Sequence, residues 1–181
     1  GGAGGAGSNV ISTLKEVTEQ AVPEVDAKPV YHNVVATVVN VSAEQTMYYL
    51  ANPENGKKVV EQEGRFWCEG DAKYVETATN RYVLNLRVMD SSGDGYVTLF
   101  NEQAEMVMGV SADELASAKL NDEDAFNALL KAARWSNWTL GVATKSREYQ
   151  GEKRLRHTGV TARQLDFVRD SQRLLDLIAR Y

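Results

Sequence analysis

Apolar and polar residues alternate along much of the first hundred positions, and a period of two predicts β-strands. The stretch Tyr31–Val41 is rich in β-branched residues and places Val34, Ala36 and Val38 on one face. Tyr82–Met89 alternates in the same way, with Tyr82 and every second residue after it apolar. Further strands are predicted at 47–50, 58–62, 65–68 and 96–100. Turn-forming residues at 90–95 (DSSGDG) make this a meander of short strands.

A helical period replaces the alternation after residue 100. Short helices are predicted at 101–108, 111–118 and 122–134, followed by a hairpin with strands at 138–146 and 154–160 and by a final helix over 161–181. Before the first strand, Val10–Ala27 is interpreted as an irregular lead-in and Gly1–Ser8 (GGAGGAGS) as a flexible linker. This order predicts a mainly β protein, a small barrel with helical additions.

The final helix carries the clearest amphipathic pattern. At 100° per residue, its apolar positions fall within an arc of about 140°. They are Phe167, Val168, Leu174, Leu175, Ile178 and Tyr181. Periodicity alone leaves two interpretations open, a helix that packs on its own domain and a helix that packs against partner helices.

A local concentration of positive charge lies in the segment 145–157 (KSREYQGEKRLRH). The segment contains five cations and only two glutamates, and Tyr149 lies at the predicted hairpin tip. Cations that neutralise phosphates beside a ring that stacks on a base suit single-stranded nucleic acid. A solvated hairpin tip is the alternative. Several further aromatic residues in the first half belong to a core or to an open stacking face, and the sequence does not assign them individually.

Composition and charge exclude several classes of protein. The chain has 181 residues, a net charge of −5 and one cysteine, Cys68, so it has no internal disulfide and no four-cysteine zinc cluster. Mean hydropathy is −0.38, and no apolar run approaches the length of a membrane helix. No nucleophile elbow, phosphate-binding loop or clustered carboxylates suggest catalysis, so we do not expect an enzyme.

Ordered segments along the chain resemble a known family. The matching stretches are 28–41, Met47-Tyr48, 57–59, Arg65–Glu69 (RFWCE), Tyr96–Glu102 (YVTLFNE) and 124–126 (DAF). Together they resemble the C-terminal OB-fold domain of the replication protein A large subunit over roughly residues 28–181. The resemblance implies a five-stranded OB-fold barrel over 28–160, with a zinc-ribbon-like insertion at about 47–80 and a C-terminal amphipathic helix over 161–181. Residues 1–27 would be linker and lead-in.

The family resemblance also implies roles for individual residues. Single-stranded DNA would be bound by Tyr149, Lys153, Arg154, Arg156, Phe66, Trp67 and Phe100. The final helix would join the middle and small subunits of a heterotrimer through Phe167, Val168, Leu174, Leu175, Ile178 and Tyr181. The domain would then act in the nucleus, in DNA replication, repair and recombination. No membrane partner is expected.

The sequence departs from this family at its zinc site. The four zinc cysteines of the family would fall near Ala51, Asn55, Cys68 and Asp71. Only one is a cysteine, and an alanine has no donor atom, so we expect zinc to be lost. Packing of Phe66, Trp67, Tyr48 and Val60 would hold the ribbon instead. This loss motivates an alternative function, a protein-interaction scaffold of a telomere or telomerase-associated paralogous complex with decayed DNA contact.

Overall fold

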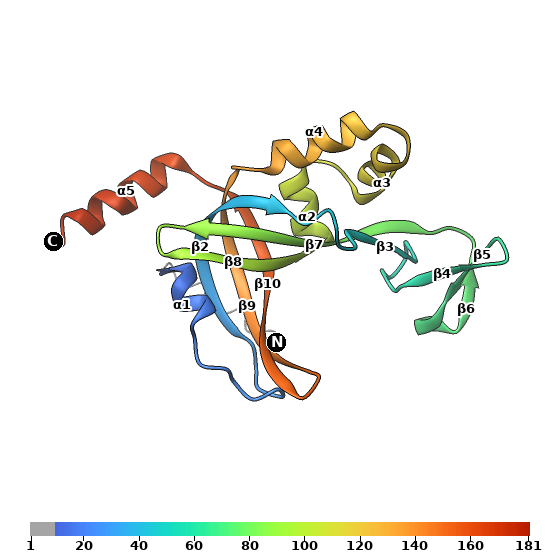
Figure 1. The fold of residues 1–181 in the computed structure, drawn as a ribbon, viewed down its shortest axis with the longest axis horizontal. Helices are drawn as coiled ribbons and strands as arrows, with labels where there is room; N and C mark the ends of the chain where they lie inside the picture. Colours follow the sequence, from blue (N-terminus) through green and yellow to red (C-terminus); the bar gives the residue numbers. More distant parts are fainter. Residues whose placement is uncertain (1–9) are drawn as a thin grey trace.

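The computed structural model describes residues 10–181, so the predicted linker Gly1–Ser8 lies outside the described residues. Its strands are β1 Ile11–Ser12, β2 Val30–Val41, β3 Tyr48–Ala51, β4 Val59–Gln62, β5 Arg65–Cys68, β6 Lys73–Val75, β7 Thr79–Asp90, β8 Gly93–Phe100, β9 Asn137–Tyr149 and β10 Glu152–Gln164. Its α-helices are α1 Leu14–Thr18, α2 Asn101–Met108, α3 Ala112–Asn121, α4 Glu123–Ala133 and α5 Phe167–Ile178. A 3-10 turn covers Glu69–Asp71. Figure 1 shows their arrangement.

Five long strands close into a barrel. The hydrogen-bonded order is β2-β9-β10-β8-β7, and β7 pairs with β2 to complete the ring. All of these pairings are antiparallel except β10 with β8. This closed mixed barrel confirms the predicted OB-fold. Because the ring is closed, each of the five strands is paired on both sides within it. β1 pairs with β2, and β3 pairs with β7, at parts of those strands that the ring leaves open.

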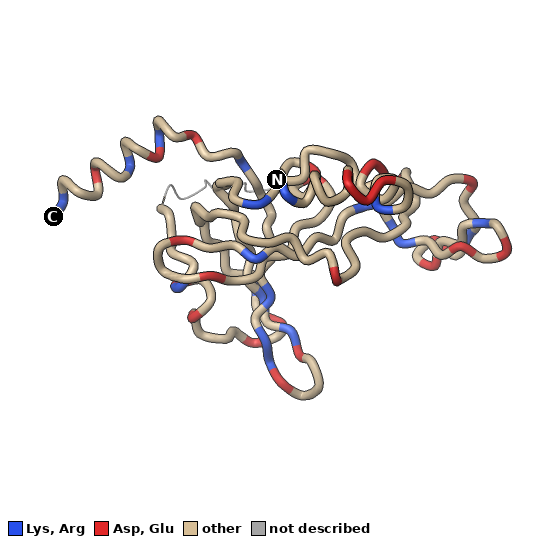
Figure 2. The backbone as a smooth tube through the Cα atoms, turned by 45° about the horizontal axis from the view of Figure 1, so that its top comes forward, with Lys and Arg blue, Asp and Glu red and all other residues tan. Residues whose placement is uncertain are grey.

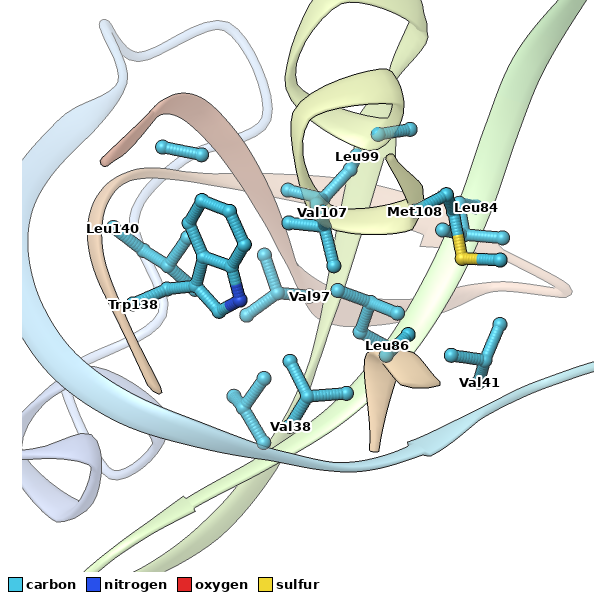
Figure 3. Close-up of a cluster of buried hydrophobic side chains, with 14 of the residues drawn as sticks. Val38, Val41, Leu84, Leu86, Val97, Leu99, Val107, Met108, Trp138 and Leu140 are labelled. Atoms are coloured by element: carbon cyan, nitrogen blue, oxygen red, sulfur yellow. The ribbon is translucent and has the colours of Figure 1, made fainter. Parts of the chain in front are cut away.

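The barrel interior is filled by the residues that the alternation placed on one face of each strand. Tyr82, Leu84, Leu86 and Val88 of β7 are all fully buried. Figure 3 shows side chains from β2, β7, β8 and β9 meeting the end of α2 in this core. A Cβ atom on Gly159 of β10 would lie 2.2 Å from Cδ2 of Leu99, which is fully buried in β8. Any larger residue at this position would force the Leu99 side chain to move within the packed core.

The segment interpreted as an irregular lead-in is partly ordered, which corrects that interpretation. α1 buries Leu14 and Val17, each 1% exposed, in the barrel core. Thr13 and Glu16 form a capping box that starts the helix. The helix is also held by a distant residue, because the Leu14 N–H donates to Asp90 Oδ2 at 2.8 Å. A five-residue helix with two apolar positions gives too short a pattern to identify.

Asp90 therefore joins α1 to the β7–β8 turn, and Asp90→Asn is expected to lower the free energy of unfolding at pH 7 by about 1 kcal/mol. Burial acts to raise the pKa of this carboxyl, but hydrogen bonds from Ser92, Leu14 and Gly93 outweigh it and lower the pKa. The carboxylate thus stabilises the fold fully above the unfolded pKa of about 3.9 and ceases to do so as pH falls through the folded value.

Urea unfolding of the wild type and the variant at pH 7 and at pH 3 tests this. The difference between them is expected to shrink in acid. Asp94→Asn is the control, since Asp94 pairs with Arg87 on the surface and both side chains are 47% exposed. A difference that is the same at both pH values would contradict the assignment.

The inserted segment folds as a second, smaller sheet. β3 pairs with β7 next to the barrel, and β4, β5 and β6 form an antiparallel three-stranded sheet that extends away from it (Figure 1). Its packing differs from the prediction. Trp67 contacts Tyr74 edge to face with ring centroids 4.9 Å apart, and Cys68 and Val59 are buried. Tyr48 packs on the barrel core instead, and Val60 is 39% exposed, because its strand turns that side chain outward.

The last strand is longer than predicted and the last helix correspondingly shorter. β10 pairs with β9 as far as Gln164, opposite Trp138. α5 begins at Phe167, after Asp166, whose carboxylate accepts hydrogen bonds from Val168 N and Arg169 N. Pairing therefore overrides helical periodicity between 161 and 164. No helix among residues 10–181 has the length and apolar character to cross a membrane.

Candidate nucleic-acid interface

The outer face of β8 carries two exposed aromatic rings. Tyr96 is 62% and Phe100 39% exposed, whereas Val97 and Leu99 between them point into the core. Thr98 lies between the rings on the same face, and its hydroxyl donates to Asn85 Oδ1 of β7 at 2.8 Å. Strand alternation thus places two exposed rings on the outer face of β8, on either side of Thr98, which is itself buried.

The β9–β10 hairpin extends from the barrel and carries a group of Lys and Arg residues (Figure 2). Alternation along the two paired strands puts four of these cations on one face. The register sets Arg154 opposite Arg147 and Arg156 opposite Lys145. Like charges that face each other across a strand pair destabilise it. Burial, followed by repulsion from Arg147, lowers the pKa of Arg156. These repulsions act against the pairing of the two strands, and the exposed ion pair of Arg154 with Glu152 at 3.1 Å offsets part of them.

Two cation–π contacts connect these cations to aromatic rings. The guanidinium of Arg154 lies 5.7 Å from the centroid of the Tyr149 ring, and that of Arg156 lies 5.9 Å from the centroid of Phe100. Tyr149 is 59% exposed at the hairpin tip. The second contact links the hairpin to the β8 face. Rings beside guanidinium groups suit a chain of alternating bases and phosphates.

The other predicted DNA-binding residues lie elsewhere. Lys153 alternates with Arg154 and so points to the opposite face of the hairpin, where it forms an ion pair with Glu24. Phe66 and Trp67 are half-buried on β5 of the small sheet, and Figure 1 shows β5 well away from β8. The structure thus brings together Tyr149, Arg154, Arg156 and Phe100.

Sequence reasoning leaves Tyr96 unassigned. Its signal is present in the alternation Tyr96, Thr98, Phe100, which places the three side chains on one face of a strand. Pairing with β7 also sets Tyr96 opposite Arg87. That neighbour depends on the register of the two strands, which the sequence of β8 alone does not contain.

A second exposed surface lies on α5, which projects away from the barrel (Figure 1). None of its residues is buried. Its exposed apolar side chains are Phe167, Val168, Leu174, Leu175, Leu177 and Ile178, and Tyr181 follows the helix, also exposed. Polar side chains bond to one another along the helix, Arg173 to Asp170 and Gln172 to Asp176. A continuous uncovered apolar face marks an interaction surface.

The residues at the four positions where the family resemblance would place zinc ligands, called here the former zinc positions, do not fit a zinc ion. Asn55, Cys68 and Asp71 do lie together, since Asp71 Oδ2 accepts hydrogen bonds from Asn55 Nδ2 at 2.6 Å and from Cys68 Sγ at 3.4 Å. The fourth position is the buried methyl group of Ala51. An amide, one carboxylate and one thiol do not make a tetrahedral zinc site. Among residues 10–181, no group of three acidic, cysteine or histidine side chains is placed to hold a metal.

Comparison with known proteins gives consistent matches. Residues 31–174 match the family model "Replication factor-A C terminal domain". The chain is 36% identical over 157 residues to a replication protein A 70 kDa DNA-binding subunit of Arabidopsis thaliana, covering 85% of the chain and 25% of that relative. It is 29% identical over 177 residues to the corresponding Xenopus tropicalis protein, covering 97% and 29%. The chain thus spans only about a quarter of the length of these relatives.

Two solved structures are also similar to this chain. A chain from a replication protein A heterotrimer bound to single-stranded DNA superposes with a TM-score of 0.76 at 32% identity, over 83% of this chain and 35% of that one. Yeast RPA bound to single-stranded DNA superposes with a TM-score of 0.79 at 21% identity, over 96% and 99%. The second match supports the fold alone.

Proposed function

The chain belongs to the replication factor-A C-terminal domain family, and from this premise we propose that it binds single-stranded DNA and organises a heterotrimer. DNA lies along the outer face of β8 and the cationic face of the β9–β10 hairpin. Bases stack on Tyr149, Phe100 and Tyr96, and phosphates contact the hairpin cations. Binding is modest for the domain alone, because the chain is acidic overall.

One observation carries the DNA-binding proposal. Two like-charge pairs face each other across the hairpin, beside rings that are exposed to solvent. Arg154 also forms an ion pair with Glu152 at 3.1 Å, but both side chains are largely exposed, so the pair offsets little of the repulsion. A polyanion bound to this face would neutralise the facing cations. The relatives are DNA-binding subunits of replication protein A, which agrees with this chemistry.

Heterotrimer assembly is assigned to α5. Its apolar face is uncovered and projects from the barrel, and one similar solved structure is a heterotrimer. We propose that helices of the middle and small subunits pack on Phe167, Val168, Leu174, Leu175, Ile178 and Tyr181. The alternative scaffold with decayed DNA contact is not favoured, because the matches are to DNA-binding subunits and the hairpin keeps its cations.

The proposed role is non-enzymatic and nuclear, in replication, repair and recombination. The domain holds a strand without changing any bond. The carboxylates of the β7–β8 turn support a non-enzymatic role, because they serve as structural contacts: Asp90 anchors α1 and Asp94 pairs with Arg87. The proposed location follows from the function of the relatives as replication proteins of eukaryotes.

Fluorescence anisotropy of labelled oligothymidine, titrated with this domain, tests DNA binding. We expect the single strand to bind better than a duplex of the same length. If about four hairpin cations contact phosphates, affinity should fall about 50-fold between 50 and 200 mM salt. No binding at low salt, or equal binding to the duplex, would overturn the proposal and leave assembly through α5 as the function of the chain.

A further inference from the structure

A lysine points into the former zinc positions of the small sheet. The Lys57 ammonium forms an ion pair with Asp71 Oδ1 and donates to Gly70 O at 3.3 Å. The other oxygen of the same carboxylate accepts from Asn55 and Cys68. One cation and one carboxylate thus connect three of the four positions at which family members would carry zinc ligands.

The backbone is shaped to admit this lysine. A Cβ atom on Gly70 would lie 2.8 Å from Lys57 Cδ, so the lysine stem lies directly across the glycine. The Asp71 side chain is only 16% exposed, against 49% for Lys57. A shielded carboxylate with a cation at one oxygen and two donors at the other has its charge and hydrogen-bonding capacity well satisfied.

Side-chain oxygens also organise the turn between β3 and β4. Asn55 Oδ1 accepts from the Lys57 N–H at 3.0 Å, and Asn52 Oδ1 accepts from the Glu54 N–H at 3.0 Å. The Asn52 N–H in turn donates to Lys57 O at 2.8 Å. These short-range bonds hold the loop in place with no metal-bound sulfur.

We propose that the Lys57 ammonium replaces the zinc ion, so that the small sheet folds around a Lys57–Asp71 ion pair and requires no metal. The positive charge that a divalent ion would supply comes from the chain itself. Hydrogen bonds to both Asp71 oxygens, the largest from Lys57, hold the pKa of that carboxyl well below its usual range. The pair therefore stays ionised at neutral pH.

Hydrogen exchange of the full 181-residue chain tests this independently of DNA binding. Lys57→Met is expected to speed exchange of the β4, β5 and β6 amides about 5-fold while leaving the barrel amides unchanged. Lys57→Arg should restore protection because it keeps the charge. Lys58→Met, at the adjacent exposed lysine, is the matched control and should have no effect.

Metal analysis gives the second readout. We expect purified wild-type protein to hold no zinc after dialysis and its exchange to be unaltered by a chelator. One tightly bound equivalent of zinc, or a sheet that opens on chelation, would overturn the proposal. Wild-type exchange in Lys57→Met would also overturn it.

Restoring the thiols tests the position of the ammonium. The triple variant Ala51→Cys, Asn55→Cys, Asp71→Cys keeps Cys68 and so provides four thiolates. Adding Lys57→Met should raise its zinc affinity at least about 10-fold, because an ammonium at the metal position repels the ion. Equal affinity with and without Lys57 would show that the lysine does not occupy that position.

Discussion

Replacing Leu174 and Ile178 of α5 with aspartate is expected to abolish assembly with the middle and small subunits while leaving the barrel folded. These side chains are 44% and 68% exposed, so their loss costs the isolated domain little. In a helix bundle each would contribute roughly 1.5–3 kcal/mol through burial, and aspartate would add the desolvation of a charge. The affinity for the partner helices should therefore fall by more than about 100-fold.

Co-purification of the three subunits after joint expression measures this. The control is Arg169→Asp with Arg180→Asp, which changes charge on the polar side of the helix and should leave assembly intact. Thermal unfolding of each isolated variant should match the wild type. Normal assembly by Leu174→Asp/Ile178→Asp would show that the partners bind elsewhere.

The second large effect is expected at the hairpin tip, where Tyr149→Ala with Arg154→Ala should weaken binding of oligothymidine about 10- to 100-fold. Loss of a stacked ring costs about 1–3 kcal/mol, and loss of one cation should reduce the slope of log K against log salt by about 0.7. The same change removes the repulsion between Arg154 and Arg147 and also the exposed ion pair of Arg154 with Glu152. Because the two effects are small and opposite, stability should change little while affinity falls.

Two control variants make this result specific. Tyr149→Phe keeps the ring and should bind within about 2-fold of the wild type. Lys153→Ala removes a cation from the opposite face, where it pairs with Glu24, and should change affinity little. A loss of affinity for Lys153→Ala as large as that for the double variant would show that DNA contacts both faces. Unchanged affinity in the double variant would remove the hairpin from the interface.

These predictions depend in different degrees on sequence and on structure. The apolar arc of α5 follows from residue spacing, but only its projection from the barrel leaves it uncovered. The hairpin cations are visible as a group in the sequence, but their division between two faces requires the register of β9 with β10. α1 escapes prediction because two apolar residues in five make too weak a signal. Its core packing depends on Asp90, which lies 76 positions from Leu14.

Local patterns in the chain are enough to establish the strand faces and the helical segments after residue 100, because side-chain alternation and helical periodicity are direct consequences of backbone geometry. The family is predicted separately, from the resemblance of ordered segments such as Arg65–Glu69 and Tyr96–Glu102. Tertiary contacts are needed to know which cations remain available and what fills the former zinc positions. Lys153 pairs with a glutamate 129 positions away, and Lys57 reaches Asp71 across 14 positions. Such contacts arise when barrel closure and the small sheet bring distant segments together, and local patterns do not encode that register.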